Sequence, residues 1–162
     1  MNLNGRILLF RIVRYGLLLL LVVAGVLLLT RNRTSNVPFE TVSARLQESI
    51  DSDHMTKEQV RFLKKFYGLN AEDYEGVLIY VPGTNMYANE VLLIRLSDTS
   101  QADSVREAIE ERIDTQHNIF AGYAPEQTAL LEQSVVDVQG NYVLYVTDYD
   151  ADRIDEVFRS AL

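Results

Sequence analysis

The sequence predicts a mixed α+β domain preceded by a transmembrane helix, and three observations support this fold class. An uncharged run of 16 residues, Tyr15 to Thr30, is bounded by an arginine at each end. After it come two pairs of short apolar runs, each pair joined by a turn-forming segment, which is the pattern of β-hairpins. Apolar residues at helical spacing lie before, between and after these pairs. We therefore expect two β-hairpins in an antiparallel sheet packed by helices.

The N-terminal run is the predicted membrane anchor. It spans about 24 Å as a helix, and Arg14 and Arg31 can extend their charged ends outward to complete a crossing of a hydrocarbon core of about 30 Å. A cleaved signal peptide is the alternative, because the apolar core Gly16–Leu29 also has the length of a signal h-region. The arginine excess before the run favours a cytoplasmic N-terminus and a domain outside the cell membrane.

The chain is thus expected to have four parts: a basic cytoplasmic tip (1–14), a single-pass transmembrane helix (15–30), a short linker (31–37) and one extracytoplasmic domain (38–162). The first 36 residues carry five arginines and no acidic residue, whereas the remainder carries ten basic and 23 acidic residues, a net charge of −13. Such a domain repels phosphate, which disfavours nucleic acid as a partner. The absence of cysteine excludes a lipoprotein attachment and a disulfide framework.

Two helices are predicted at the start of the domain. The first covers residues 38–51, with an apolar face formed by Phe39, Val42, Leu46 and Ile50. The second is expected to open at the capping-box pattern Thr56–Gln59 and to stop at Gly68 in the left-handed conformation. Its apolar face would be formed by Val60, Leu63 and Phe66.

The strands are predicted from apolar runs of strand length. Residues 76–82 and 90–97 form the first hairpin, with Gly83–Asn89 as its loop. Residues 135–139 and 142–147 form the second, joined by the turn pair Gly140-Asn141. We expect helices to cover one face of the resulting sheet.

Helices are also predicted after each hairpin. The longest runs from Ser97 or Asp98 to Tyr123, followed by two turns over 126–133. Its apolar face comprises Ala102, Val105, Ile109, Ile113, Gln116 and Phe120. A last helix is expected to begin at a capping Asp150 or Asp152.

Four motifs occur in a characteristic order: Phe66-Tyr-Gly-Leu-Asn70, then Asn85-Met86 with Ala88 and Glu90, then Tyr123-Ala-Pro-Glu-Gln127 with Leu130-Leu131, and Gly140-Asn-Tyr142. This set, over about residues 45 to 162, resembles the bacterial family called domain of unknown function 4358. The resemblance implies an extracytoplasmic domain of Gram-positive bacteria, attached by a lipoprotein cysteine or a membrane helix. The family has no assigned activity, so no catalytic residue is carried over.

The sequence contains no recognisable catalytic, cofactor or metal motif. Neither histidine, His54 or His117, lies near a serine or cysteine nucleophile motif. The cluster from Asp148 to Glu156 begins like an EF-hand loop, but Arg153 and Arg159 replace the required glycine and glutamate. Helix capping accounts for this cluster, and weak cation binding by it stays open.

The hairpin loop Gly83–Glu90 is the preferred functional candidate, because Met86 and Tyr87 lie mid-loop where no periodicity requires apolar residues. The corner Tyr123–Gln127 is the second candidate. Together they supply the expected partner contacts: Asn85, Met86, Tyr87, Glu90, Tyr123 and Glu126. Alternatively, Met86 folds back over the end of the core and Glu90 anchors the loop.

Three functions remain open. The preferred one is a non-catalytic binding module that presents the loop to a protein of the cell envelope. The second is an acidic structural spacer. The third is a hydrolase that uses carboxylates such as Glu90 and Glu126, which would have to lie in one cleft.

Overall fold

The computed structural model describes residues 13–23, 25, 34–51 and 55–162. The chain divides into two compact units, residues 1–33 and residues 34–162, and each is described by itself.

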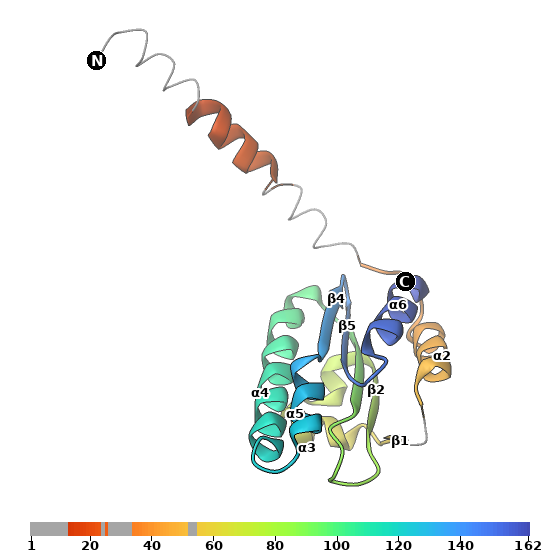
Figure 1. Ribbon diagram of the computed structural model, residues 1–162. Coiled ribbons are helices and arrows are strands. Elements are labelled where there is room, and N and C mark those ends of the chain that lie inside the picture. The colour runs from red at the N-terminus through yellow and green to blue at the C-terminus, as the bar shows by residue number, and fades with distance from the viewer. Residues whose placement is uncertain (1–12, 24, 26–33, 52–54) are drawn as a thin grey trace, which may run out of the picture. The chain divides into compact units, whose positions relative to one another are not determined.

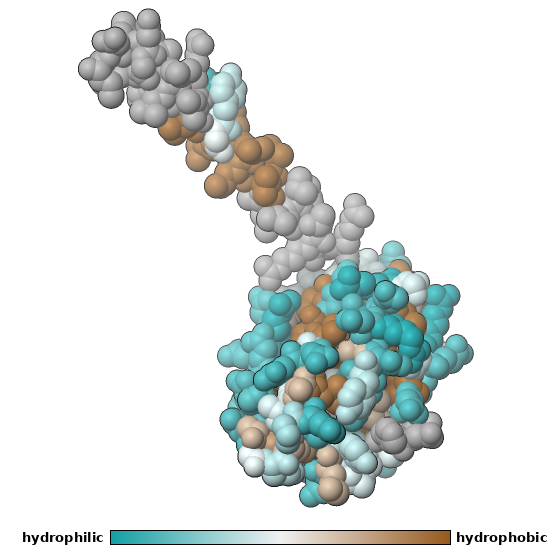
Figure 2. Space-filling view, in the orientation of Figure 1, coloured by the Kyte–Doolittle hydropathy of each residue, from teal (hydrophilic) through white to brown (hydrophobic). Residues whose placement is uncertain are grey.

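In the first unit, residues 13–23 are helical, and their leucine and valine side chains are exposed. The described part of this unit is largely hydrophobic (Figure 2). Within the ranges that the structure describes, no helix is long and apolar enough to cross a membrane. The predicted span 15–30 includes residues 24 and 26–30, which lie outside the described residues, as does the predicted tip up to residue 12.

An antiparallel five-stranded sheet forms the centre of the second unit, residues 34–162. Its strands are β1 (Met55–Lys57), β2 (Tyr74–Pro82), β3 (Glu90–Leu96), β4 (Val135–Gln139) and β5 (Tyr142–Thr147). They are arranged in the order β1-β2-β3-β5-β4, and every neighbouring pair is antiparallel. Both predicted hairpins, β2–β3 and β4–β5, are therefore confirmed.

Helices and short 3-10 turns connect the strands. The helices are α2 (Phe39–Ser49), α3 (Arg61–Tyr67), α4 (Ala102–Phe120), α5 (Pro125–Glu132) and α6 (Ala151–Ala161). The 3-10 turns are η1 (Ala71–Asp73) and η2 (Thr99–Gln101). The mixed α+β class predicted from the sequence is confirmed.

Helices cover both faces of the sheet, so the prediction of a single covered face is wrong. On one face, α2 and α6 pack through residues such as Leu46 and Phe158, and on the other, α3 and α4 pack through Leu63 and Ile109. Figure 1 shows these two layers on opposite sides of the strands. The physical reason lies in β3, where the successive apolar residues 91–94 are all buried. Because alternate side chains point to opposite faces, such a run requires cover on both.

The predicted capping box at Thr56–Gln59 is also wrong. Residues Met55–Lys57 form β1 and pair with residues 80–82 at the edge of the sheet. The helix α3 begins only at Arg61, without a side-chain cap. Val60, predicted on its apolar face, is 52% exposed. Pairing with β2 and burial of Met55 outweigh the local capping preference. The left-handed stop at Gly68 is confirmed, with φ 69°.

The last helix, α6, begins after Asp150, as predicted, but without a side-chain cap. The Asp150 carboxylate instead pairs with Arg153 at 3.1 Å. The Asp148 Oδ1 atom accepts a hydrogen bond from the Asp150 backbone N–H at 2.9 Å. Asp148 therefore stabilises the turn before α6. The helix-capping pattern in the sequence pointed to Asp150 or Asp152 instead.

Candidate functional site

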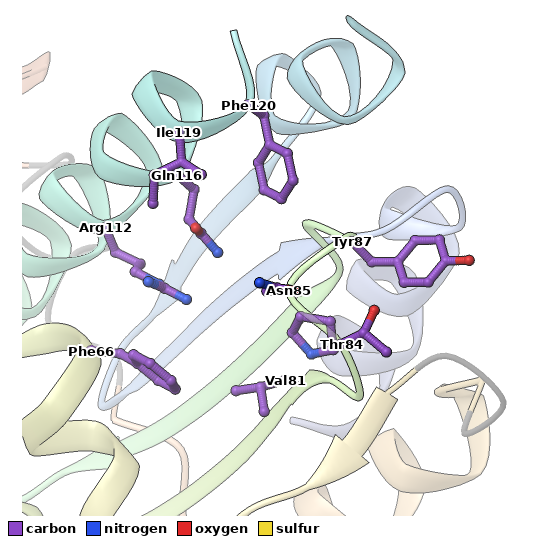
Figure 3. A pocket seen from close by; sticks show the side chains of 10 residues that line it. Phe66, Val81, Thr84, Asn85, Tyr87, Arg112, Gln116, Ile119 and Phe120 are labelled. Carbon is purple, nitrogen blue, oxygen red and sulfur yellow. The ribbon is translucent and has the colours of Figure 1, made fainter. Parts of the chain in front are cut away.

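A cavity of about 280 Å³ lies where the β2–β3 loop faces the C-terminal half of α4. Figure 3 shows it between α3, α4 and this loop. Ten residues line it: Phe66, Val81, Pro82, Thr84, Asn85, Tyr87, Arg112, Gln116, Ile119 and Phe120.

The helix α4 supplies two polar side chains of this cavity, Arg112 and Gln116, and the 3-10 turn η2 that leads into it opens with a capping box. The Asp98 carboxylate accepts a hydrogen bond from the Ser100 backbone N–H at 2.8 Å, and the Gln101 side chain accepts one from the Asp98 N–H at 3.0 Å. From this start, Arg112 and Gln116 are four residues apart and share one helix face. That face turns toward the loop (Figure 3).

One buried and one partly buried hydrogen bond anchor the base of the loop. The Ala88 backbone N–H donates to Gln127 Oε1 at 2.8 Å, and Asn89 Nδ2 donates to Asp148 Oδ2 at 2.9 Å. Ala88 also packs against Phe120 within a small apolar cluster. The two candidate segments predicted from the sequence, 83–90 and 123–127, therefore meet through Gln127.

Behind the cavity, Glu90 forms a buried ion pair with Arg112. The Arg112 Nη2 atom lies 2.8 Å and Nε lies 3.1 Å from Glu90 Oε2. The Tyr67 hydroxyl donates to Glu90 Oε1 at 2.6 Å. The Arg112 guanidinium also lies over the Phe66 ring, 4.4 Å from its centroid, in a cation–π contact.

The charges of this cluster balance. Burial, and then the nearby Glu90 carboxylate, raise the pKa of Tyr67 well above its usual value, so its hydroxyl stays protonated as a donor. Burial lowers the pKa of Arg112, but the attraction of Glu90 raises it more, and the net direction is upward. Arg112 therefore stays charged and Glu90 compensates it, which leaves the cluster neutral overall.

Two donors of the cavity are not used by the protein. Gln116 is only 8% exposed, yet its carboxamide makes no hydrogen bond to the described residues. The Arg112 Nη1 atom likewise makes none, since only Nε and Nη2 bond to Glu90. Figure 3 shows both side chains pointing into the cavity, with Asn85 on the opposite wall. The cavity thus offers polar groups that a bound molecule can satisfy.

Most of the predicted contact residues lie at this end of the domain. Met86 is 69% exposed, Tyr87 42% and Tyr123 63%, so Met86 does not close the core. Asn85 and Tyr87 line the cavity, although the Tyr87 ring points away from its centre in Figure 3. Glu126 is exposed in the first turn of α5.

Glu90 has a different position from the other predicted contacts. Its side chain is fully buried and paired with Arg112, which corresponds to the alternative role of loop anchor. The sequence did not indicate a role for Tyr67 or Arg112, and it indicated Gln127 only as the last residue of the candidate corner 123–127. One usable signal was present, because Gln116 is a polar residue on the otherwise apolar face of α4.

Among the described residues, no group of three or more histidine, aspartate or glutamate side chains could hold a metal ion. His117 lies 3.7 Å from Glu132 on α5. His54 lies outside the described residues.

No curated protein matches this sequence, and no solved structure matches it. A family model does match, over residues 48–148, which is more than half of the chain. It covers β1 through β5 and includes the loop, the cavity and the Glu90–Arg112 pair. The chain therefore belongs to the family described as domain of unknown function DUF4358.

Proposed function

We propose that this protein is a non-catalytic binding module, anchored in the cell membrane through residues 15–30 with its domain outside, which holds a partner protein of the cell envelope. The partner would dock on the loop end of the sheet, at the β2–β3 loop and the neighbouring corner 123–127. The observation that carries the proposal is an exposed Met86-Tyr87 pair on a loop whose base is fixed by the buried hydrogen bond between Ala88 and Gln127.

Exposed apolar side chains surround the cavity and support a docking role. Tyr87 and Ile119 both line it and are exposed. Tyr123 is exposed as well, and its ring lies 5.8 Å from that of Phe120, which lines the cavity. Aromatic side chains, methionine and arginine are enriched in the cores of protein interfaces, whereas lysine, glutamate and aspartate are depleted there.

The anchored loop also reduces the cost of association. Binding orders flexible segments at a cost of about 0.5–1.5 kcal/mol per immobilised side chain, and a surface held in place before binding avoids part of it. Here Gln127 and Asp148 hold Ala88 and Asn89 at the end of the loop. Met86 and Tyr87 immediately precede them, so the anchored residues limit the positions that this pair can adopt.

The membrane anchor rests on the sequence. The uncharged run 15–30, with three arginines before it, favours insertion with the N-terminus inside. The acidic domain would then remain away from an anionic bilayer surface by charge repulsion.

The hydrolase alternative loses its main candidate. Glu90 is sealed from solvent and bonded to Tyr67 and Arg112, so this carboxylate is not presented to a substrate. The spacer alternative is favoured by the net charge of −13 after residue 36. A spacer depends on that charge, whereas a binding module depends on the loop.

Photo-crosslinking in intact cells tests the proposal. A photoreactive amino acid replaces Tyr87 in the full chain, and mass spectrometry identifies the adducts. The matched control places the same amino acid at Glu48, an exposed position of α2. This helix covers the face of the sheet opposite to the one covered by α3 and α4. We expect one dominant protein adduct from position 87 and none from position 48. With normal expression, equal adducts from both positions, or none from position 87, would overturn the proposal.

Two further variants distinguish the binding module from the acidic spacer. Replacing Met86 and Tyr87 by serine should abolish the adduct formed from a probe at neighbouring Asn85. Replacing Glu107, Glu110 and Glu111 on the exposed face of α4 by glutamine should leave that adduct unchanged. The reverse result would favour the spacer.

A further inference from the structure

We propose that the cavity beside Arg112 and Gln116 binds an uncharged amide group, a peptide bond or a carboxamide, together with the apolar side chain next to it. This inference rests on the proposed function, because it specifies which chemistry of the partner protein enters the site.

The cavity donors that the protein leaves unused define the hydrogen bonds that a ligand can make in place of solvent. A carboxamide such as that of Gln116 has two N–H donors and an acceptor oxygen, and the Arg112 Nη1 atom adds further donors. Gln116 is more than nine-tenths buried and has no partner among the described residues. A ligand that supplies both an acceptor and a donor satisfies this pair, and an amide does so with two adjacent atoms.

The charge balance favours an uncharged ligand over an anion. Arg112 is already compensated by the Glu90 carboxylate, whose Oε2 atom lies 2.8 Å from Nη2. A ligand carboxylate would bring a second negative charge toward the Glu90 carboxylate, which is fully buried and therefore weakly screened by solvent. The surrounding domain, with 23 acidic and ten basic residues after residue 36, adds repulsion at long range.

The apolar walls favour a peptide side chain over a sugar. Sugars usually require an open aromatic face, but the guanidinium of Arg112 covers one face of Phe66 at 4.4 Å. Phe120 is almost fully buried, and the Tyr87 ring points away from the centre of the cavity (Figure 3). What remains toward the cavity is aliphatic surface from Val81, Pro82 and Ile119, which suits an aliphatic side chain.

The size of the cavity agrees with this ligand. At about 280 Å³ it is just below the range of about 300–1,000 Å³ that is usual for small-molecule pockets. It therefore suits one side chain with an adjoining amide better than a large cofactor. A partner protein would insert such a group while its surroundings contact Met86, Tyr87 and Tyr123.

NMR titration of the full chain in detergent micelles tests the inference. The probe is N-acetyl-leucinamide, which carries an aliphatic side chain between two amides. N-acetyl-leucine, identical except for a carboxylate, tests the charge argument, and methyl β-glucoside tests the sugar alternative. We expect N-acetyl-leucinamide to shift the Gln116 and Asn85 carboxamide resonances saturably, and to bind about tenfold more tightly than N-acetyl-leucine.

Two variants locate the binding. Gln116→Leu keeps the approximate size but removes the amide, so we expect binding of N-acetyl-leucinamide to weaken about tenfold, read from the Asn85 carboxamide. Gln133→Leu, the same change at an exposed position after α5, should leave binding unchanged. Backbone NMR spectra check that both variants retain the fold.

The results separate the two proposals. Equal binding of N-acetyl-leucine, a shift produced only by the glucoside, full binding by Gln116→Leu, or no saturable shift with N-acetyl-leucinamide would each overturn the inference. If the adduct at position 87 persists in cells when the amide probe fails to bind, only this inference fails. If the amide probe binds but no protein adduct forms at position 87, the cavity is an amide site and the partner-docking function fails.

Discussion

The Arg112 Nη2 atom lies 2.8 Å from Glu90 Oε2 in an ion pair whose carboxylate is fully buried. It joins the second half of α4 to the first residue of β3, where the candidate loop ends. The Tyr67 hydroxyl, from the last residue of α3, completes the hydrogen bonds of the same carboxylate. Three elements that are distant in sequence are therefore held together at one point behind the cavity.

Removing only one partner of the Glu90–Arg112 ion pair should lower the stability of the fold strongly. In Arg112→Met, the Glu90 charge stays buried without compensation, and we expect a loss of about 3–5 kcal/mol in the free energy of unfolding. The double variant Glu90→Leu with Arg112→Met removes both charges and should lose less than the single variant. Urea unfolding of residues 34–162 measures both.

Arg106→Met is the matched control for that experiment, because Arg106 lies on the exposed face of α4. Its effect should stay within about 0.5 kcal/mol. If Arg112→Met behaves like Arg106→Met, the pair does not hold the three elements together.

The contact between Ala88 and Gln127 should control the order of the loop. Gln127→Leu keeps the approximate side-chain size but leaves the buried Ala88 N–H without its acceptor, at a cost of about 1–3 kcal/mol. We expect faster amide hydrogen exchange at Ala88, while exchange in the middle of β3 responds only to the global stability. Gln133→Leu serves as the control, and unchanged exchange at Ala88 in Gln127→Leu would show that the loop is held by other contacts.

The sequence predicted the hairpins well because their signals are local. The pair Gly140-Asn141 between apolar runs fixes the β4–β5 turn, and both strands have the predicted bounds 135–139 and 142–147. The run 90–97 also predicted β3, which ends one residue earlier at Leu96. Its continuous apolar character indicates burial on both faces, although we expected helices on one face only.

The site was only partly predictable, since its chemistry depends on distant pairings. The loop was predicted as a contact site because Met86 and Tyr87 lie mid-loop, where no periodicity requires apolar residues. Two of its predicted contact residues, Asn85 and Tyr87, line the cavity. Nothing local indicates that Arg112 pairs with Glu90, 22 residues away. The strand β1 was missed because Thr56–Gln59 matches a helix start, and only pairing with β2 reveals it.

Asp155, a carboxyl group on α6, should make the domain less stable as the pH rises. Burial, and then the neighbouring Asp137, raise the pKa of Asp155 above its ordinary value of 3.8. Arg159 compensates it in part, at 2.9 Å. A carboxyl whose pKa is raised in the folded state stabilises the fold below its unfolded pKa, and this contribution is lost as the pH rises through the folded pKa.

Asp155→Asn should remove that pH dependence. We expect the variant to gain stability relative to the parent as the pH rises from about 4 toward 7, because the repulsion from Asp137 disappears. Urea unfolding at a series of pH values measures the difference. Asp152→Asn, an exposed neighbour on α6, is the control. A constant difference between parent and Asp155→Asn across this pH range would contradict the assignment.

The close approach of the Phe39 ring to Gly76 should prevent β2 from accepting a larger residue at position 76 without loss of stability. A Cβ atom at position 76 would collide with the Phe39 ring on α2, where β2 also shifts its register against β3. Gly76→Ala therefore forces the ring aside, and we expect a loss of about 1–3 kcal/mol in the free energy of unfolding. Gly122→Ala, where a Cβ meets open space, should change stability by less than about 0.5 kcal/mol.

A second substitution shows whether the collision is the cause. Phe39→Leu replaces the ring by a smaller aliphatic side chain. Adding Gly76→Ala to this variant should therefore lower the free energy of unfolding less than adding Gly76→Ala to the parent chain. The comparison is a double-mutant cycle, in which two contacting residues give a coupling energy of about 0.5–3 kcal/mol. Additive effects of the two substitutions would mean that the backbone conformation at position 76, and not the close approach of α2, requires glycine there.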